Sequence, residues 1–144
     1  GELFVIRNVA NLVPPYRAGE GLQGTSTAIE FAVRYLKVGL ILVLGHARCG
    51  GVGAALQPQQ VEDTVFLGQW INLLEVAKQR AGAADQDTLE HVSVQVSLER
   101  LMTFPFVEAA VRAGTLKLAG ARFSIFDGQL AVLDHVSGKF SKVA

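Results

Sequence analysis

His46 and Cys49 are the residues of this sequence whose types and spacing best suit chemistry. They stand three positions apart in the stretch GHARCGG (residues 45–51), and Cys49 is the only cysteine of the chain. An imidazole nitrogen and a thiolate are ligands that Zn²⁺ prefers in proteins. The glycines beside them allow tight backbone geometry and leave room for a small ligand. The pair is therefore a candidate metal site.

Spacing alone leaves three other interpretations of this pair open. Cys49 can be a small apolar core residue beside a hydrogen-bonded histidine. The glycine-rich turn and the helix expected after it can bind an anion, although GHARCGGVG lacks the lysine and hydroxyl of a phosphate-binding P-loop. Cys49 can also act as a nucleophile with His46 as its base.

The elements expected around the pair would place it at the edge of a sheet. Residues 39–45 (GLILVLG) are apolar at both alternating positions, which predicts a central parallel strand covered on both faces. Residues 50–56 resemble the first turns of a helix, whose dipole would favour a thiolate at Cys49. Ligands of open α/β sheets bind beyond the carboxyl ends of the strands. We therefore expect the pair at such an end.

The remaining segments alternate between strand and helix patterns. We expect a strand at 2–8, helices at 25–37, 61–80, 87–104 and 105–114, and a hairpin of two strands around Asp127-Gly128. Asp87 or Thr88 is expected to cap the helix 87–104. These segments predict an α/β fold with a mainly parallel sheet of about four strands plus an antiparallel edge strand, flanked by α-helices. A length of 144 residues suits a single domain over 1–144.

Composition narrows the class of partner. The chain has 13 basic and 13 acidic residues, which argues against nucleic acid or a membrane surface as the main partner. The longest apolar stretch, 38–44, is too short to span a bilayer. Half of the residues are hydrophobic, which favours self-association. A single cysteine fits a reducing compartment, so we expect a cytoplasmic protein, with an N-terminal targeting segment left open.

Several blocks of the sequence resemble the β-class carbonic anhydrases, especially their plant-like branch. These blocks are GELFVIRNVANLVPPY, then GTSTAIEFAVRYLKVGLILVLGHARCGG, and finally GARFSIFDGQLAVLD. The resemblance implies a zinc enzyme that reversibly hydrates carbon dioxide to bicarbonate and a proton through a zinc-bound hydroxide. It makes His46 and Cys49 two of three fixed zinc ligands. It also implies a homodimer or higher homo-oligomer with active sites at the subunit interface.

The resemblance also assigns residues around the metal. The substrate pocket would be lined by Phe4, Val9, Phe31 and Gly50, the last with its backbone N–H facing the bound anion. Residues expected to support the site structurally are Arg7, Asn8, Gly45 and Gly51. Without the resemblance, the three apolar pocket residues would be assigned to the core.

Part of the family's site lies outside this sequence. In the family, the third zinc ligand is a cysteine of an upstream C-x-D-x-R motif, which also supplies an Asp–Arg pair. This chain has no second cysteine. We therefore expect an N-terminally incomplete form of a working enzyme, weak or inactive by itself. The alternative is a catalytically inactive zinc-binding or scaffold homologue.

Overall fold

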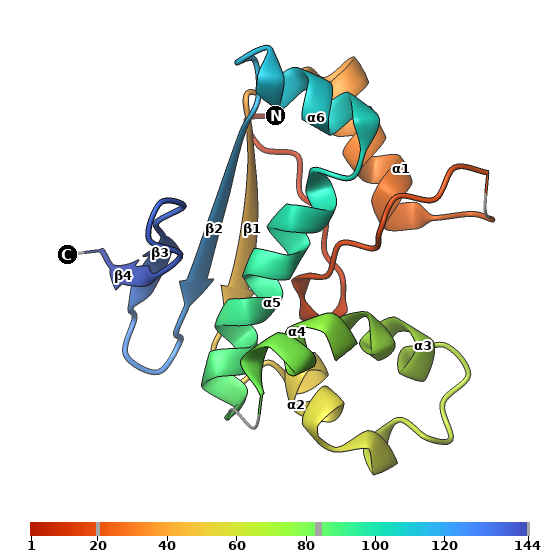
Figure 1. Cartoon of the computed structure of the whole chain (residues 1–144), viewed down its shortest axis with the longest axis vertical. Coiled ribbons are helices and arrows are strands. Elements are labelled where there is room, and N and C mark those ends of the chain that lie inside the picture. Colours follow the sequence, from red (N-terminus) through yellow and green to blue (C-terminus); the bar gives the residue numbers. More distant parts are fainter. Residues whose placement is uncertain (20, 83–84, 144) are drawn as a thin grey trace.

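The computed structural model describes residues 1–19, 21–82 and 85–143. Four strands form one open sheet in the order β1 (Leu40–His46), β2 (Lys117–Phe123), β3 (Leu130–Leu133) and β4 (Phe140–Lys142). The α-helices are α1 (Gly24–Glu30), α2 (Gly50–Leu56), α3 (Leu67–Ile71), α4 (Glu75–Ala81), α5 (Gln86–Leu101) and α6 (Pro105–Arg112). The β3–β4 hairpin stands at one end of the molecule, and the helices gather at the other (Figure 1).

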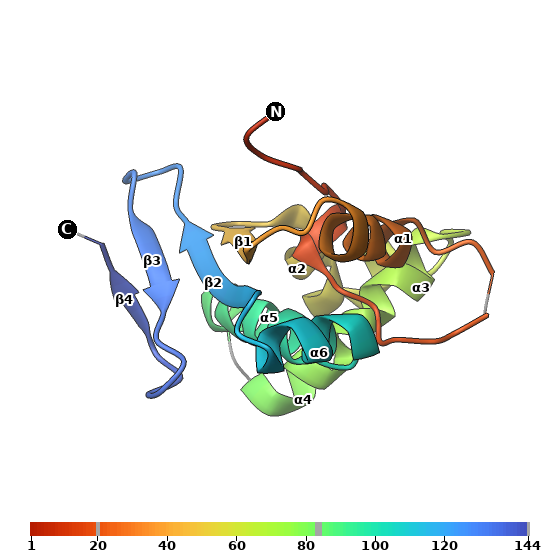
Figure 2. The same cartoon turned by 90° about the horizontal axis from the view of Figure 1, so that it is seen from above.

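Helix α5 is the central element of the helical side. It packs on β1 and β2 with one side and on α2 and α4 with the other, as seen from above in Figure 2. One hydrophobic cluster forms towards α2 and includes Val52, Leu74 and Leu89. A second cluster forms towards the sheet and α6 and includes Val94 and Phe104. Both cores therefore depend on the same helix.

The sheet contains one parallel pair and two antiparallel pairs. Strands β1 and β2 run parallel, with Leu40 opposite Lys117 and His46 opposite Phe123, and their arrows point the same way in Figure 1. Strands β2, β3 and β4 pair antiparallel. The predicted α/β fold with about four strands and flanking helices is confirmed. Parallel pairing is less frequent than expected, because the segment 2–8 does not join the sheet and the chain adds a strand, β4, that the sequence analysis did not foresee.

The N-terminal segment 1–8 forms no strand in the structure. It is extended and leaves Leu3 and Val5 more than two-thirds exposed. Its β-type sequence satisfies local propensity, but a strand needs a neighbour to accept and donate its backbone hydrogen bonds. In the described part of the chain this segment has no such neighbour.

Strand β1 is covered on one face only, which corrects the expectation of two covered faces. Val43 and Gly45 are buried beneath α5, whereas Leu40, Leu42 and Leu44 are each at least half exposed. Alternate side chains point to opposite faces of a strand. The apolar residues of the second face therefore form an open hydrophobic surface.

Three expected helices differ in their boundaries. The segment 61–80 becomes α3, a 3₁₀ turn over Asn72–Leu74 and α4, because the residues before Leu67 form turns. The helix expected at 25–37 ends as a π-helical turn over Phe31–Tyr35. Helix α5 begins earlier than expected, because Asp85 rather than Asp87 or Thr88 is its cap.

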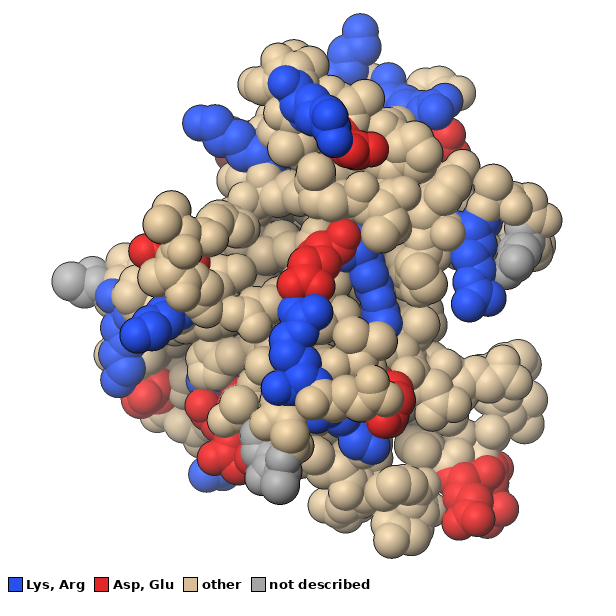
Figure 3. Space-filling model, in the orientation of Figure 1, with Lys and Arg blue, Asp and Glu red and all other residues tan. Residues whose placement is uncertain are grey.

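Charged side chains are dispersed over the surface. On the face shown in Figure 3, Lys and Arg lie near Asp and Glu on a mostly uncharged background. Among the helices that the structure describes, none combines the length and the apolar character that crossing a bilayer would require.

Candidate metal site at the end of strand β1

His46 and Cys49 lie on either side of the short loop that joins β1 to α2. His46 is the last residue of β1, and Cys49 is the residue immediately before α2. The backbone N–H of Ala47 donates to the carbonyl oxygen of Phe123 at 2.8 Å, which continues the β1–β2 pairing into the loop. The site is thus attached to the parallel strand pair.

The imidazole of His46 is exposed, and one of its nitrogens is engaged. Its Nδ1 lies 3.0 Å from the carbonyl oxygen of Ala47. A carbonyl oxygen only accepts hydrogen bonds, so this contact assigns the proton to Nδ1. Nε2 then carries the free lone pair that a metal ligand requires.

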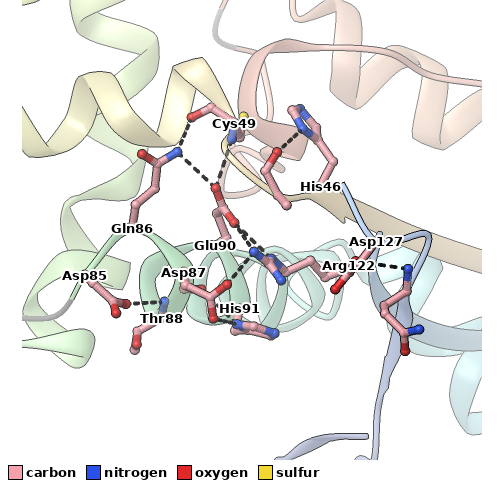
Figure 4. A network of polar contacts seen from close by, with 12 residues as sticks. His46, Cys49, Asp85, Gln86, Asp87, Thr88, Glu90, His91, Arg122 and Asp127 are labelled. Carbon is pink, nitrogen blue, oxygen red and sulfur yellow. Dashed lines mark hydrogen bonds and ion pairs between the residues drawn. The ribbon is translucent and has the colours of Figure 1, made fainter. Parts of the chain in front are cut away.

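Cys49 is a free cysteine with an exposed fraction of 4%. Its backbone N–H donates to Oε1 of Glu90 at 2.9 Å, and its carbonyl oxygen accepts from Nε2 of Gln86 at 2.9 Å. The same carbonyl accepts the first hydrogen bond of α2, from Gly53. Figure 4 shows these contacts converging on the Cys49 backbone from α5.

Glu90 is a buried carboxylate with a partly buried cationic partner. Arg122, on β2, donates to Oε2 of Glu90 from Nε at 2.9 Å and from Nη2 at 2.7 Å, and it also pairs with Asp87. Arg122 stands opposite Gly45 in the sheet, and Gly45 is the residue directly before His46. The carboxylate therefore links α5, β2 and the Cys49 loop (Figure 4).

Sequence reasoning missed Glu90 and Arg122, although a signal was present. Glu90 belongs to the buried stripe of α5 that continues through Val94, Ser97 and Leu101. A charged residue in such a stripe needs a partner, because an unpaired buried charge is costly. Arg122 is a candidate partner, because it stands inside β2 next to the small apolar residues Gly120 and Ala121.

The N-terminus of α5 is fixed beside this cluster. The carboxylate of Asp85 accepts a hydrogen bond from the backbone N–H of Thr88 at 2.8 Å. This hydrogen bond holds the pKa of Asp85 below its ordinary value, because it favours the ionised form. The cap fixes the start of α5, whose first two turns carry Gln86 and Glu90.

Close backbone packing connects the start of α2 with the N-terminal loop. A Cβ on Gly51 would lie 2.6 Å from Cγ1 of Val9 and 3.0 Å from Cβ of Ala10. Trp70 donates from Nε1 to the carbonyl oxygen of Val9 at 2.8 Å. Val9 is therefore held close to the Cys49 loop.

The other residues expected near the site lie as follows. Asn8 closes the turn before α1 with two hydrogen bonds to the backbone of Leu12, both at 2.9 Å, whereas Arg7 is exposed. Phe4 and Phe31 pack on each other with ring centroids 5.8 Å apart. A Cβ on Gly50 would meet no atom within 4 Å, so the space in front of this residue is open.

Comparison with known proteins assigns the chain to a family. Residues 1–130 match the family model described as "Carbonic anhydrase". The chain is 38% identical over 136 residues to β carbonic anhydrase 5, chloroplastic, of Arabidopsis thaliana, and 36% identical over 151 aligned positions to a carbonic anhydrase of Pseudomonas aeruginosa. The chain belongs to the β-carbonic anhydrase family.

Solved β-carbonic anhydrases share the fold. The β-carbonic anhydrase CcaA superimposes with a TM-score of 0.88 at 27% identity, covering 99% of this chain and 73% of that one. A tetrameric β-carbonic anhydrase of Sordaria macrospora gives a TM-score of 0.70 at 26% identity, covering 98% of this chain and 70% of that one.

The chain spans only part of its relatives. Its matched region covers 88% of this chain and 44% of the Arabidopsis protein, and 100% of this chain and 68% of the Pseudomonas protein.

The donors at the end of β1 fit zinc in type but not in number. A thiol and an imidazole with a free Nε2 are suitable zinc ligands, and a zinc site uses at least three protein ligands. Within residues 1–19, 21–82 and 85–143, no group of three His, Cys, Asp or Glu side chains is placed to hold a metal ion. A complete β-carbonic anhydrase metal site therefore needs a donor beyond this pair.

Proposed function

We propose that this chain forms the core of an enzyme that reversibly hydrates carbon dioxide to bicarbonate and a proton, with Zn²⁺ held in part by His46 and Cys49. The observation that carries the proposal is the pair itself at the end of β1. One ligand offers a free Nε2, and the other stands on a backbone that is fixed on both sides of Cys49. Family membership supports the class of reaction.

Zinc bound here would supply a Lewis acid that makes water nucleophilic near neutral pH. The third ligand is expected from a segment outside the 144 residues, carrying the family's C-x-D-x-R motif. Strand β1 pairs only with β2 among the described strands, so its other edge is open for a further strand. A parallel strand added there would end beside His46.

The substrate pocket is proposed at Phe4, Val9, Phe31 and Gly50. Carbon dioxide carries no charge, so an apolar wall suits it. The open space in front of Gly50 and the position of Val9 near Gly51 support a pocket beside the metal ligands. Phe4 and Phe31, each 44% exposed, provide apolar surface for this wall.

The working unit is proposed to be a homo-oligomer. The open face of β1 exposes Leu40, Leu42 and Leu44. An exposed apolar surface of this kind favours contact with a partner. One similar solved structure is a tetramer, which supports self-association. A reducing compartment such as the cytoplasm would suit a metal-ligating cysteine.

Zinc content after dialysis tests the proposal. We expect the chain to retain more zinc than H46A or C49S, whereas H135A should retain as much as the unchanged chain. His135 is an exposed histidine and provides the matched control. Equal zinc content in the unchanged chain and the two ligand variants would overturn the metal site.

Activity separates the proposed enzyme from the inactive homologue. We expect hydration of carbon dioxide once a C-x-D-x-R segment is joined to the chain, and its loss in C49S. Zinc retention without turnover in the joined protein would favour the scaffold alternative. A cysteine nucleophile would instead predict alkylation of Cys49 that added zinc does not slow.

A further inference from the structure

The Glu90–Arg122 pair is buried far more than stability alone would favour. Glu90 is 2% exposed and the Arg122 side chain 13% exposed. Removing both charges from water is costly, and replacement of such a pair by apolar residues is often neutral or stabilising. The burial of this pair is therefore weak evidence for a stabilising role, and its contacts indicate another one.

All the contacts of the Glu90 carboxylate point to the loop or to groups that orient it. Oε2 accepts both hydrogen bonds from Arg122. Oε1 accepts from the backbone N–H of Cys49 at 2.9 Å and from Nε2 of Gln86 at 3.0 Å. Arg122 thus fixes one oxygen, and the other oxygen is aimed at the Cys49 amide (Figure 4).

The backbone N–H and the carbonyl oxygen of Cys49 are both held by side chains from neighbouring turns of α5. Glu90 accepts from its N–H, and Gln86, one turn earlier on α5, donates to its carbonyl oxygen. Hydrogen bonds that involve a charged group are about twice as strong as neutral ones. One charge-assisted contact from Glu90 and one neutral contact from Gln86 leave the Cys49 backbone little freedom to turn its thiol away.

A second Arg–Glu pair, whose glutamate also lies on α5, shows the contrast. Arg80 and Glu99 form two hydrogen bonds, the second at 2.8 Å, with side chains 43% and 58% exposed. This pair joins α4 to α5 at the surface, where an ion pair contributes little. Glu90, by contrast, contacts the backbone of a proposed metal ligand.

We propose that Glu90, Gln86 and Arg122 are positioning residues that hold Cys49 in the orientation needed to bind a metal ion. This inference rests on the proposed zinc site. Groups that orient metal ligands raise metal affinity, and their loss commonly costs about 10–100-fold in affinity. The cluster acts through the backbone of Cys49 and does not itself touch the metal.

The variant E90Q tests the cluster with little change of shape. A glutamine has an accepting oxygen at one terminal position and a donating NH₂ group at the other. Either Arg122 or the Cys49 amide, which contact different oxygens of Glu90, would therefore face a second donor. Arg122 keeps an anionic partner in Asp87, so E90Q should still fold. Q86M, which loses only the side-chain hydrogen bonds of Gln86, is the second variant. E99Q, which breaks the surface pair on the same helix, is the matched control.

Two measurements on the 144-residue chain read out the effect. The first is the hydrogen-exchange rate of the Cys49 backbone amide in metal-free protein, compared with the amide of Val94 in the middle of α5. The second is the dissociation constant for added Cd²⁺, followed by the ultraviolet absorption of the thiolate–Cd²⁺ bond. A purely structural role would change the exchange of the whole helix but not the Cd²⁺ affinity.

In E90Q we expect a faster hydrogen-exchange rate at the Cys49 amide and an unchanged rate at the Val94 amide. We also expect E90Q to bind Cd²⁺ about 10-fold more weakly than the unchanged chain. Q86M should weaken Cd²⁺ binding in the same direction, and E99Q should behave as the unchanged chain. Unaltered exchange and Cd²⁺ affinity in E90Q would overturn the proposal. Absence of a thiolate–Cd²⁺ band in the unchanged chain would instead overturn the zinc site and this role with it, while the exchange rates would still show whether Glu90 holds the amide.

Discussion

Cys49 is fixed at its backbone by side chains distant in the sequence. Glu90 lies 41 positions away and Gln86 37 positions away. His46, in contrast, is oriented by the carbonyl of the next residue, Ala47. One proposed ligand is therefore set by local chain geometry and the other by tertiary contacts, and single substitutions should reveal the difference.

Replacement of the α5 cap should make stability depend less on pH. The folded-state pKa of Asp85 is lowered by its hydrogen bond from Thr88. Its contribution is therefore present above the unfolded pKa and is lost as the pH falls through the folded pKa. We expect D85A to lower the free energy of unfolding near neutral pH and to match the unchanged chain in acid. Urea unfolding across this pH range checks it, and an equal loss at every pH would contradict it.

Gly51 should not tolerate a side chain. A methyl group there would overlap Val9 and Ala10, and overpacking of this kind costs about 1–3 kcal/mol. We expect G51A to lower the free energy of unfolding by that amount. G50A is the neighbouring control, since its methyl group would meet open space. Chemical denaturation of each variant measures the free energy of unfolding. Equal stability of G51A and G50A would argue against the close approach of Gly51 to Val9 and Ala10.

Helix α5 connects every part of the molecule that bears on the site. Its first turns hold the Cys49 loop, its middle packs on β1 and β2, and its last residue, Leu101, joins the core shared with α6. Because two hydrophobic clusters meet on this helix, a substitution in either cluster should lower the free energy of unfolding of the whole chain. The junction of α5 and α6 offers a direct test.

Phe104 fills the junction between α5 and α6. It is 1% exposed and lies edge-on to Tyr16 and Phe106. We expect F104A to lower the free energy of unfolding by about 3–5 kcal/mol, because it removes buried area and leaves a cavity. F66A is the matched control, since Phe66 is 84% exposed. Thermal and urea unfolding measure both, and a small effect of F104A would show that the junction collapses to fill the space.

The molecule as a whole carries a hydrophobic face that it does not cover itself. Leu40, Leu42 and Leu44 lie along β1 on the side opposite α5, and Phe31 and Tyr35 stack with centroids 5.5 Å apart. An exposed apolar surface of this kind favours contact with a partner.

A charge on the open face of β1 should weaken self-association. We expect L42K to shift the chain towards monomers, because a lysine ammonium cannot be buried without a partner. V136K is the control, since Val136 is 98% exposed on the β3–β4 turn. Light scattering coupled to size-exclusion chromatography measures the mass. An unchanged mass for L42K would place the oligomer contact elsewhere.

The sequence by itself determined the local elements and the pair of donors. The run before His46 gave β1, the glycines after Cys49 permitted α2 to start at Gly50, and Asp127-Gly128 predicted the turn between β2 and β3. Each of these depends on residues close in the chain, whose propensities and periodicity are visible without coordinates. The family resemblance led to the class of reaction that we propose.

Only the tertiary structure decided which segments found partners. The segment 2–8 has the composition of a strand but no neighbour, and β1 is apolar on both faces but covered on one. The link from Glu90 to Cys49 and Arg122 joins three elements, and no periodicity in one segment reports on it. Strand pairing, burial and a shared carboxylate are properties of residues brought together by folding. The sequence therefore named the two proposed ligands, and only the fold decided which residues hold the Cys49 backbone.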